Sequence, residues 1–65
     1  MIDQKERLLR EADAADVLAL SVKTLRGWRV KGNGPVYHKL GSAVRYSPAD
    51  LEAFVAAGSR NSTSQ

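Results

Sequence analysis

The 65-residue chain contains no cysteine and a single histidine, His38. Without cysteine there is neither a disulfide nor a thiolate metal ligand, and one histidine cannot by itself build a metal site or a catalytic dyad. The sequence also shows no nucleophile–base pair, carboxylate dyad or phosphate-binding glycine loop. We therefore expect no catalytic residue, no metal and no cofactor, and we predict that the protein is not an enzyme.

Long apolar runs are also missing. No stretch approaches the roughly 20 apolar residues that a membrane-spanning helix needs. The N-terminus, Met-Ile-Asp-Gln-Lys-Glu-Arg, is too polar to be a secretory signal. We expect no membrane partner and a cytoplasmic protein.

Acidic residues are absent from the middle of the chain. Residues 21–46 carry six basic residues and no acid, whereas residues 1–20 carry three basic and five acidic residues, within an overall charge of +3. A uniformly solvated surface would mix the two signs, and segregation of this kind is the electrostatic footprint of a nucleic-acid binder. The six cations are Lys23, Arg26, Arg29, Lys31, Lys39 and Arg45.

The basic segment begins with a predicted helix over residues 21–31. Ser21 is a good N-cap, and Leu25 and Trp28 share one side at 3.6 residues per turn. The other side is cationic and includes Gly27, which costs a helix about 0.5–1 kcal/mol but allows close approach to a ligand. The pattern indicates a helix anchored from behind and presented to a polyanion. An ordinary surface helix with a solvated basic face remains the alternative.

A second helix is predicted directly before the basic one, beginning at Glu11. The apolar spacing i, i+3, i+4 indicates a core-facing stripe, made by Ala14, Ala15 and Leu18 with Val17 alongside. Only Ala19-Leu20 separates the two helices, which is typical of a helix-turn-helix motif. A generic helical hairpin is the alternative, and the basic character of the second helix favours the helix-turn-helix.

A β-hairpin is predicted after Gly32, a natural helix terminator. Two strands, 36–40 and 44–46, flank Gly41-Ser42-Ala43. Side-chain logic favours a three-residue loop, in which Leu40 faces Val44, His38 faces Tyr46 on a buried side that continues to Val36, and Lys39 faces Arg45 on the open side. Facing like charges are destabilising, so a phosphate is expected near that pair. A two-residue Gly-Ser loop would separate them.

The last predicted element is a structural helix. Ser47 caps it, Pro48 takes its first position, and Gly58 closes it. Its apolar stripe consists of Leu51, Phe54 and Val55. We predict a mobile arm over residues 1–7, one domain over residues 8–58 and a disordered tail over residues 59–65.

This order of elements resembles the bacterial excisionase and MerR-like winged helix-turn-helix family, which includes AlpA-like small regulators and recombination directionality factors. The similarity runs from about Leu8 to Ala57. It is carried by Leu8-Leu9, Ala14-Ala15-Asp16, Leu18, Ser21, Thr24-Leu25-Arg26, Trp28, Tyr37, Lys39-Leu40-Gly41, Val44-Arg45-Tyr46 and Ser47-Pro48-Ala49-Asp50-Leu51.

The resemblance implies a mostly α fold with a two-stranded wing: helix, turn, recognition helix, wing and C-terminal helix. The recognition helix would enter the major groove, the wing would reach the adjacent backbone or minor groove, and Arg45 would bind phosphate. It implies an excisionase-type factor that bends DNA near an attachment site and steers an integrase towards excision, or a small transcriptional regulator of a prophage or integrative element. The chain shows no long dimerisation helix or effector domain, so no small-molecule effector is expected.

Three positions depart from the family pattern. Arg10 stands where a capping Ser or Thr is frequent, and Ala19 stands where glycine is frequent. If that turn is left-handed, alanine is strained by about 1–2 kcal/mol. Ser42 replaces a basic residue at the wing tip, which favours phosphate clamping over deep insertion into the minor groove.

Double-stranded DNA is thus the predicted partner, with self-association on repeated sites. Lys23 and Arg26 are candidates for base edges, since basic side chains pair with guanine. The first helical turn after Ser21 offers N–H groups to phosphate, and Gly27 and Ser42 lie in the interface. Backbone contacts are assigned to Thr24, Arg29, Lys31, Lys39 and Arg45, although Arg29 could instead lie along the core edge.

Two binding functions other than DNA binding are alternatives. A protein-interaction module, antitoxin-like or adaptor, could use the same fold, and the charge segregation favours DNA over it. RNA binding is disfavoured because Trp28 belongs to the predicted core, which leaves only Tyr37 as a possible stacking platform.

Overall fold

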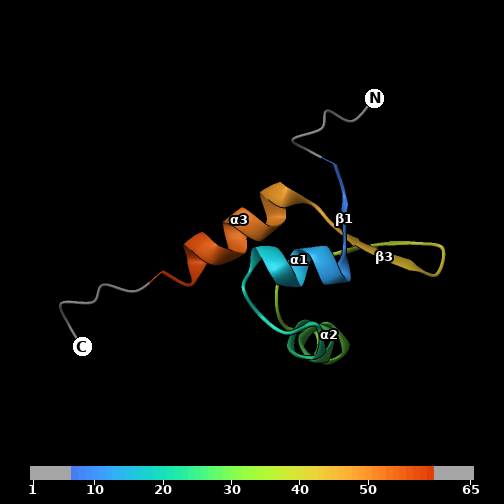
Figure 1. Ribbon diagram of the computed structural model, residues 1–65, viewed down its shortest axis with the longest axis horizontal. Helices are drawn as coiled ribbons and strands as arrows, with labels where there is room; N and C mark the ends of the chain where they lie inside the picture. The colour runs from blue at the N-terminus through green and yellow to red at the C-terminus, as the bar shows by residue number, and fades with distance from the viewer. Residues whose placement is uncertain (1–6, 60–65) are drawn as a thin grey trace.

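The computed structural model describes residues 7–59, so the predicted mobile arm and disordered tail lie almost entirely outside the described residues. The elements in chain order are β1 (Leu9–Arg10), α1 (Glu11–Val17), α2 (Val22–Lys31), β2 (His38–Leu40), β3 (Ala43–Tyr46) and α3 (Pro48–Ala57). In Figure 1 α1 lies between α2 and α3, and the hairpin projects to one side. The predicted class, mostly α with a small β wing, is confirmed.

The core is small and lies where the helices meet the sheet. Its five buried apolar residues are Ala14, Ala15, Leu25, Tyr46 and Leu51. The two alanines of α1 are small, which allows α2 to pack closely against α1. Trp28 packs against this cluster from α2, and its ring centroid lies 5.5 Å from that of Phe54 on α3.

The link between α1 and α2 is a tight turn with a left-handed residue. The N–H of Leu20 donates to the carbonyl of Ala15 at 2.9 Å, and Ala19 has a φ of 57°. Ser21 then begins α2 as predicted, since its Oγ accepts from the N–H of Thr24 at 3.0 Å. Arg10, at the N-cap of α1, makes no side-chain capping bond.

Ala19→Gly is expected to raise the free energy of unfolding by about 0.5–1 kcal/mol. A left-handed alanine costs about 1–2 kcal/mol, and the greater freedom of glycine in the unfolded chain offsets part of that gain. Chemical denaturation measures the difference. Ala53→Gly, at an exposed position inside α3, is the matched control and should instead lose about 0.5–1 kcal/mol. A loss at both positions would contradict strain at Ala19.

The hairpin register differs from the prediction. The pairs are Leu40 with Ala43, Lys39 with Val44 and His38 with Arg45, so the loop is the two-residue Gly41-Ser42. Gly41 has a φ of 66°, which suits the first position of such a loop. A one-residue shift reverses the face of every side chain on a strand. Consequently Lys39 does not face Arg45, and Val36, His38 and Leu40 are exposed rather than buried.

The sheet has a third strand that the sequence prediction lacked. β1 pairs antiparallel with β3, giving the order β1-β3-β2 with Leu9 opposite Tyr46 and Arg10 opposite Arg45. Two residues are too few for a period-2 pattern to be visible. The strand ties the beginning of the domain to the wing and places the start of α1 beside Tyr46.

The helix α3 forms as predicted, with the Ser47 hydroxyl accepting from the N–H of Asp50 at 3.1 Å. Leu51 is buried, but Val55 is 58% exposed, and Val17 on α1 is 63% exposed. Both predicted core assignments are therefore wrong, since these valines line an open apolar groove between α1 and α3. None of the helices among residues 7–59 is long and apolar enough to cross a membrane.

Candidate nucleic-acid interface

The outward face of α2 is cationic and open. Lys23, Arg26 and Lys31 are exposed, while Leu25 on the opposite side is fully buried. A Cβ built on Gly27 would meet no atom within 4 Å. The helix is therefore held by its apolar side, and its basic side offers a surface with a bare backbone position at its centre, as the sequence predicted.

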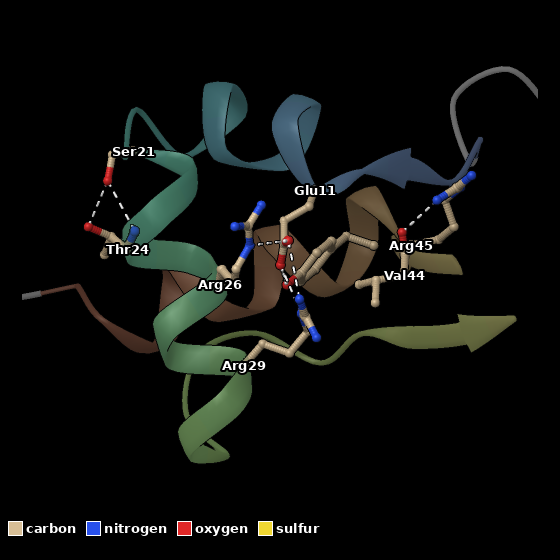
Figure 2. A network of polar contacts seen from close by, with 8 residues as sticks. Glu11, Ser21, Thr24, Arg26, Arg29, Val44 and Arg45 are labelled. Carbon is tan, nitrogen blue, oxygen red and sulfur yellow. Dashed lines mark hydrogen bonds and ion pairs between the residues drawn. The ribbon is translucent and has the colours of Figure 1, made fainter. Parts of the chain in front are cut away.

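The first turn of α2 is closed by its own side chains. Besides accepting from the Thr24 N–H, the Ser21 hydroxyl donates to Thr24 Oγ1 at 2.9 Å. Figure 2 shows the two residues facing each other at the start of the helix. Both side chains remain exposed. Their bonds leave the N–H groups of Val22 and Lys23, rather than that of Thr24, as candidates for a phosphate.

A carboxylate lies behind the basic face. Glu11, the first residue of α1, accepts from Arg29 Nε at 2.9 Å on Oε2 and from Arg29 Nη2 at 3.3 Å on Oε1. Its Oε2 also accepts from the Tyr46 hydroxyl at 3.1 Å, and Arg26 Nε lies 3.7 Å from Oε1. Figure 2 shows both arginines converging on this one side chain. Glu11 thus joins α1, α2 and β3 at one point.

These contacts shift the acidity of the groups involved. The hydrogen bond from Arg29 holds the pKa of Glu11 below its ordinary value of 4.5, against a smaller opposing effect of burial. The same bond raises the pKa of Arg29. Burial, helped by the hydrogen bond to Glu11, raises the pKa of Tyr46 from 10.0 to about 12. Glu11 is therefore a carboxylate and Tyr46 a neutral donor throughout the physiological range.

Arg29 differs from the other cations of α2. Its side chain is 22% exposed, against 62% for Arg26, and its guanidinium carbon lies 5.7 Å from the ring centroid of Tyr37. Of the two roles predicted for Arg29, a contact with the DNA backbone or a place along the core edge, its position fits the core edge. Its contact with the DNA backbone stays a prediction.

On the sheet, a row of basic side chains crosses the three strands. Arg10 on β1 and His38 on β2 lie directly opposite Arg45 on either side of it. Arg45 Nη1 donates to the carbonyl of Val44 at 2.8 Å, and His38 Nε2 lies 3.3 Å from Asp50 Oδ2. Because facing like charges repel, an anion between Arg10 and Arg45 would stabilise the row. Lys39 and Ser42 are exposed elsewhere on the hairpin.

A family model for a helix-turn-helix domain matches residues 8–59. The chain belongs to this helix-turn-helix family. This family covers excisionase-like small DNA-binding proteins and is typically non-enzymatic, so membership suggests DNA binding. A search of curated proteins found no match. In this helix-turn-helix domain, no group of three or more His, Cys, Asp or Glu residues among positions 7–59 could hold a metal ion.

The charge segregation follows the architecture of the helix-turn-helix domain. Every acid among residues 7–59 lies on α1 or α3, whereas α2 and the two wing strands carry only basic charges. The acids are Glu11, Asp13, Asp16, Asp50 and Glu52. The basic segment of the sequence is thus the second helix of the motif together with its wing.

Two residues at the candidate site were not predicted from the sequence. Glu11 precedes Ala14, Ala15 and Leu18 at the spacing i, i+3, i+4 and i+7, so it lies on the buried stripe of α1. An acidic residue on a buried apolar stripe indicates that a cation of the same chain pairs with it, so this contact could have been predicted. Arg10 had no comparable signal, because its place opposite Arg45 depends on β1.

Proposed function

We propose that this protein binds double-stranded DNA sequence-specifically by inserting α2 into the major groove. One observation carries the proposal: α2 exposes a cationic, acid-free face around Gly27 while its apolar side is buried in the core. The major groove admits an α-helix, and a position without a side chain permits close contact with the DNA.

Each cation has a proposed task. Lys23 and Arg26 contact base edges, where a good paired bond discriminates by about 1–3 kcal/mol. The wing binds the adjacent backbone through a phosphate between Arg10 and Arg45, which face each other across β1 and β3. The remaining phosphate contacts are assigned to Ser21, Thr24, Lys31, Lys39 and Ser42, while Arg29 pairs with Glu11 at the edge of the core.

The proposed biological role is that of an excisionase-type recombination directionality factor, which bends DNA near an attachment site and works with an integrase. The alternative is a small transcriptional regulator of a prophage or integrative element. Both roles rest on the resemblance noted in the sequence and place the protein in the cytoplasm on the nucleoid. Copies on repeated sites are proposed to associate, for which the open apolar groove at Val17 and Val55 provides unpaired surface.

Selection from a random-sequence DNA library tests the proposal. The protein is expected to enrich one motif and to bind it with an affinity that falls steeply with salt, with a slope of about −0.9 per phosphate neutralised. Enrichment of no motif, together with binding to a protein partner that is insensitive to salt, would indicate an adaptor. A bend at the selected site and an adjacent integrase gene would favour the excisionase role over the regulator.

Arg26→Ala is expected to weaken binding to the selected duplex about 10-fold or more, with little effect on a scrambled duplex. The side chain is 62% exposed, so the fold should be retained. Lys31→Ala is the comparison, because loss of a phosphate contact should weaken both duplexes alike and reduce the salt slope by about 0.9. If Arg26→Ala weakens binding to both duplexes equally, Arg26 does not contact base edges.

A further inference from the structure

The position of the Glu11 carboxylate is set by the folded core rather than by the DNA-facing surface. Glu11 is 14% exposed, and three hydrogen bonds from Arg29 and Tyr46 hold its two oxygens. Tyr46 is itself 1% exposed, so one donor is immobilised inside the domain. Glu11 is therefore a fixed negative charge lying directly behind α2.

The remaining contact of that carboxylate is with the exposed face. Arg26 approaches Oε1 with Nε, at 3.7 Å, and its side chain makes no hydrogen bond to residues 7–59. Its terminal nitrogens stay uncommitted, on a side chain that is 62% exposed. An ion pair this exposed is weak, so it biases the direction of the side chain without preventing it from binding another group.

We propose that Glu11 is a positioning residue that determines the sequence specificity of the interface, by orienting Arg26 towards base edges and keeping Arg29 away from phosphates. The inference rests on the proposed DNA binding and adds a residue that does not itself touch DNA. A negative charge near the interface lowers sequence-independent affinity, which comes from phosphates. A bias in the direction of the Arg26 guanidinium favours the paired geometry that distinguishes guanine.

The charge balance of the cluster gives the expected direction of change. With Glu11 ionised, the three side chains of Glu11, Arg26 and Arg29 carry a net charge of +1, and with a neutral residue there they carry +2. Glu11→Gln therefore raises the net charge by one. It also removes the ion pairs that hold Arg29 and orient Arg26. Affinity for any DNA should rise, while discrimination between sequences should fall.

The test compares the duplex enriched in the library selection with a scrambled duplex of the same length and base composition, each about two helical turns long. For Glu11→Gln we expect about 3–10-fold tighter binding to the scrambled duplex, a specificity ratio reduced about 5–10-fold, and a steeper salt slope by up to about 0.9. If this variant does not fold, it is measured together with Ala19→Gly, which leaves the interface unchanged.

Two variants separate positioning from charge and from folding. Asp13→Asn removes an exposed acid from the same helix that has no partner among residues 7–59, so it should change the specificity ratio little. Glu11→Asp keeps the carboxylate and should restore the salt slope of the unmodified protein. Equal weakening of both duplexes by Glu11→Gln, with an unchanged slope, would overturn the inference and leave the proposed function standing. No sequence preference in the unmodified protein would overturn both.

Discussion

Gly27→Glu is expected to weaken DNA binding by about 100-fold while leaving the fold at least as stable. The Cβ would enter open space, and glutamate is a better helix former than glycine by about 0.5 kcal/mol. Facing DNA, the same side chain adds bulk and a negative charge among phosphates, and like-charge contacts at an interface cost several kcal/mol. Stability and affinity should therefore change in opposite directions.

Binding to the selected duplex and chemical denaturation, measured on the same preparations, test this prediction. Ala53→Glu on the exposed side of α3 makes the same change in net charge, and its affinity should stay within about 2-fold of the unmodified protein because α3 lies outside the proposed interface. Gly27→Ala should stabilise the domain by about 0.5–1 kcal/mol. If Gly27→Glu binds as Ala53→Glu does, α2 does not enter the groove.

Arg29→Met is expected to lower the free energy of unfolding by about 2–3 kcal/mol at neutral pH. Removing one partner of a buried ion pair costs about 3–5 kcal/mol, and we place this pair lower because Arg29 is 22% exposed. The substitution leaves Glu11 with only the Tyr46 hydroxyl and the distant Arg26. A domain of this size has a total stability of roughly 3–10 kcal/mol, so the loss is a large part of it.

The effect of Arg29→Met should depend on pH. The folded pKa of Glu11 lies below 4.5, mainly because of Arg29. Stabilisation by the ionised pair is therefore fully present above pH 4.5 and is lost as the pH falls through the lowered pKa. The two proteins should approach each other in stability below pH 4.5, and denaturation across that range measures the convergence.

The exposed Lys23→Met is the matched control, since it removes a cation of α2 that has no acidic partner among the described residues. Its stability should change by less than about 0.5 kcal/mol at any pH. A difference between Arg29→Met and the unmodified protein that persists unchanged in acid would mean that the loss comes from packing against Tyr37 rather than from the pair with Glu11.

The starts and ends of the helices could be predicted from the sequence. Ser21 and Ser47 begin α2 and α3, Gly32 ends α2 with a φ of 81°, and Ala19 adopts the left-handed conformation that its position suggested. Each depends on a few neighbouring residues, through a capping oxygen or a backbone preference. The exposed side of α2 that carries Lys23, Arg26 and Lys31 was also predictable, because charge and helical period place these residues away from Leu25.

Contacts between residues far apart in the sequence could not be predicted in the same way. The prediction placed Lys39 opposite Arg45, but Gly41 and Ser42 alone form the loop, and the one-residue shift exchanges the two faces of the strand. It also placed Val17 in the core, where its spacing along α1 allowed it. Whether a residue on the edge of a stripe is covered depends on the angle at which the next helix packs.

By itself the sequence determined the order of the three helices and the hairpin, the caps of α2 and α3, and the concentration of positive charge on the second helix and wing. These follow from interactions within one turn or from composition, which folding does not alter. Only the tertiary structure decided that β1 joins the wing, that Arg10 lies opposite Arg45, and that Glu11 holds Arg29 eighteen positions away. Those pairings arise because packing around Leu25, Tyr46 and Leu51 brings distant segments together, and no local pattern encodes that geometry.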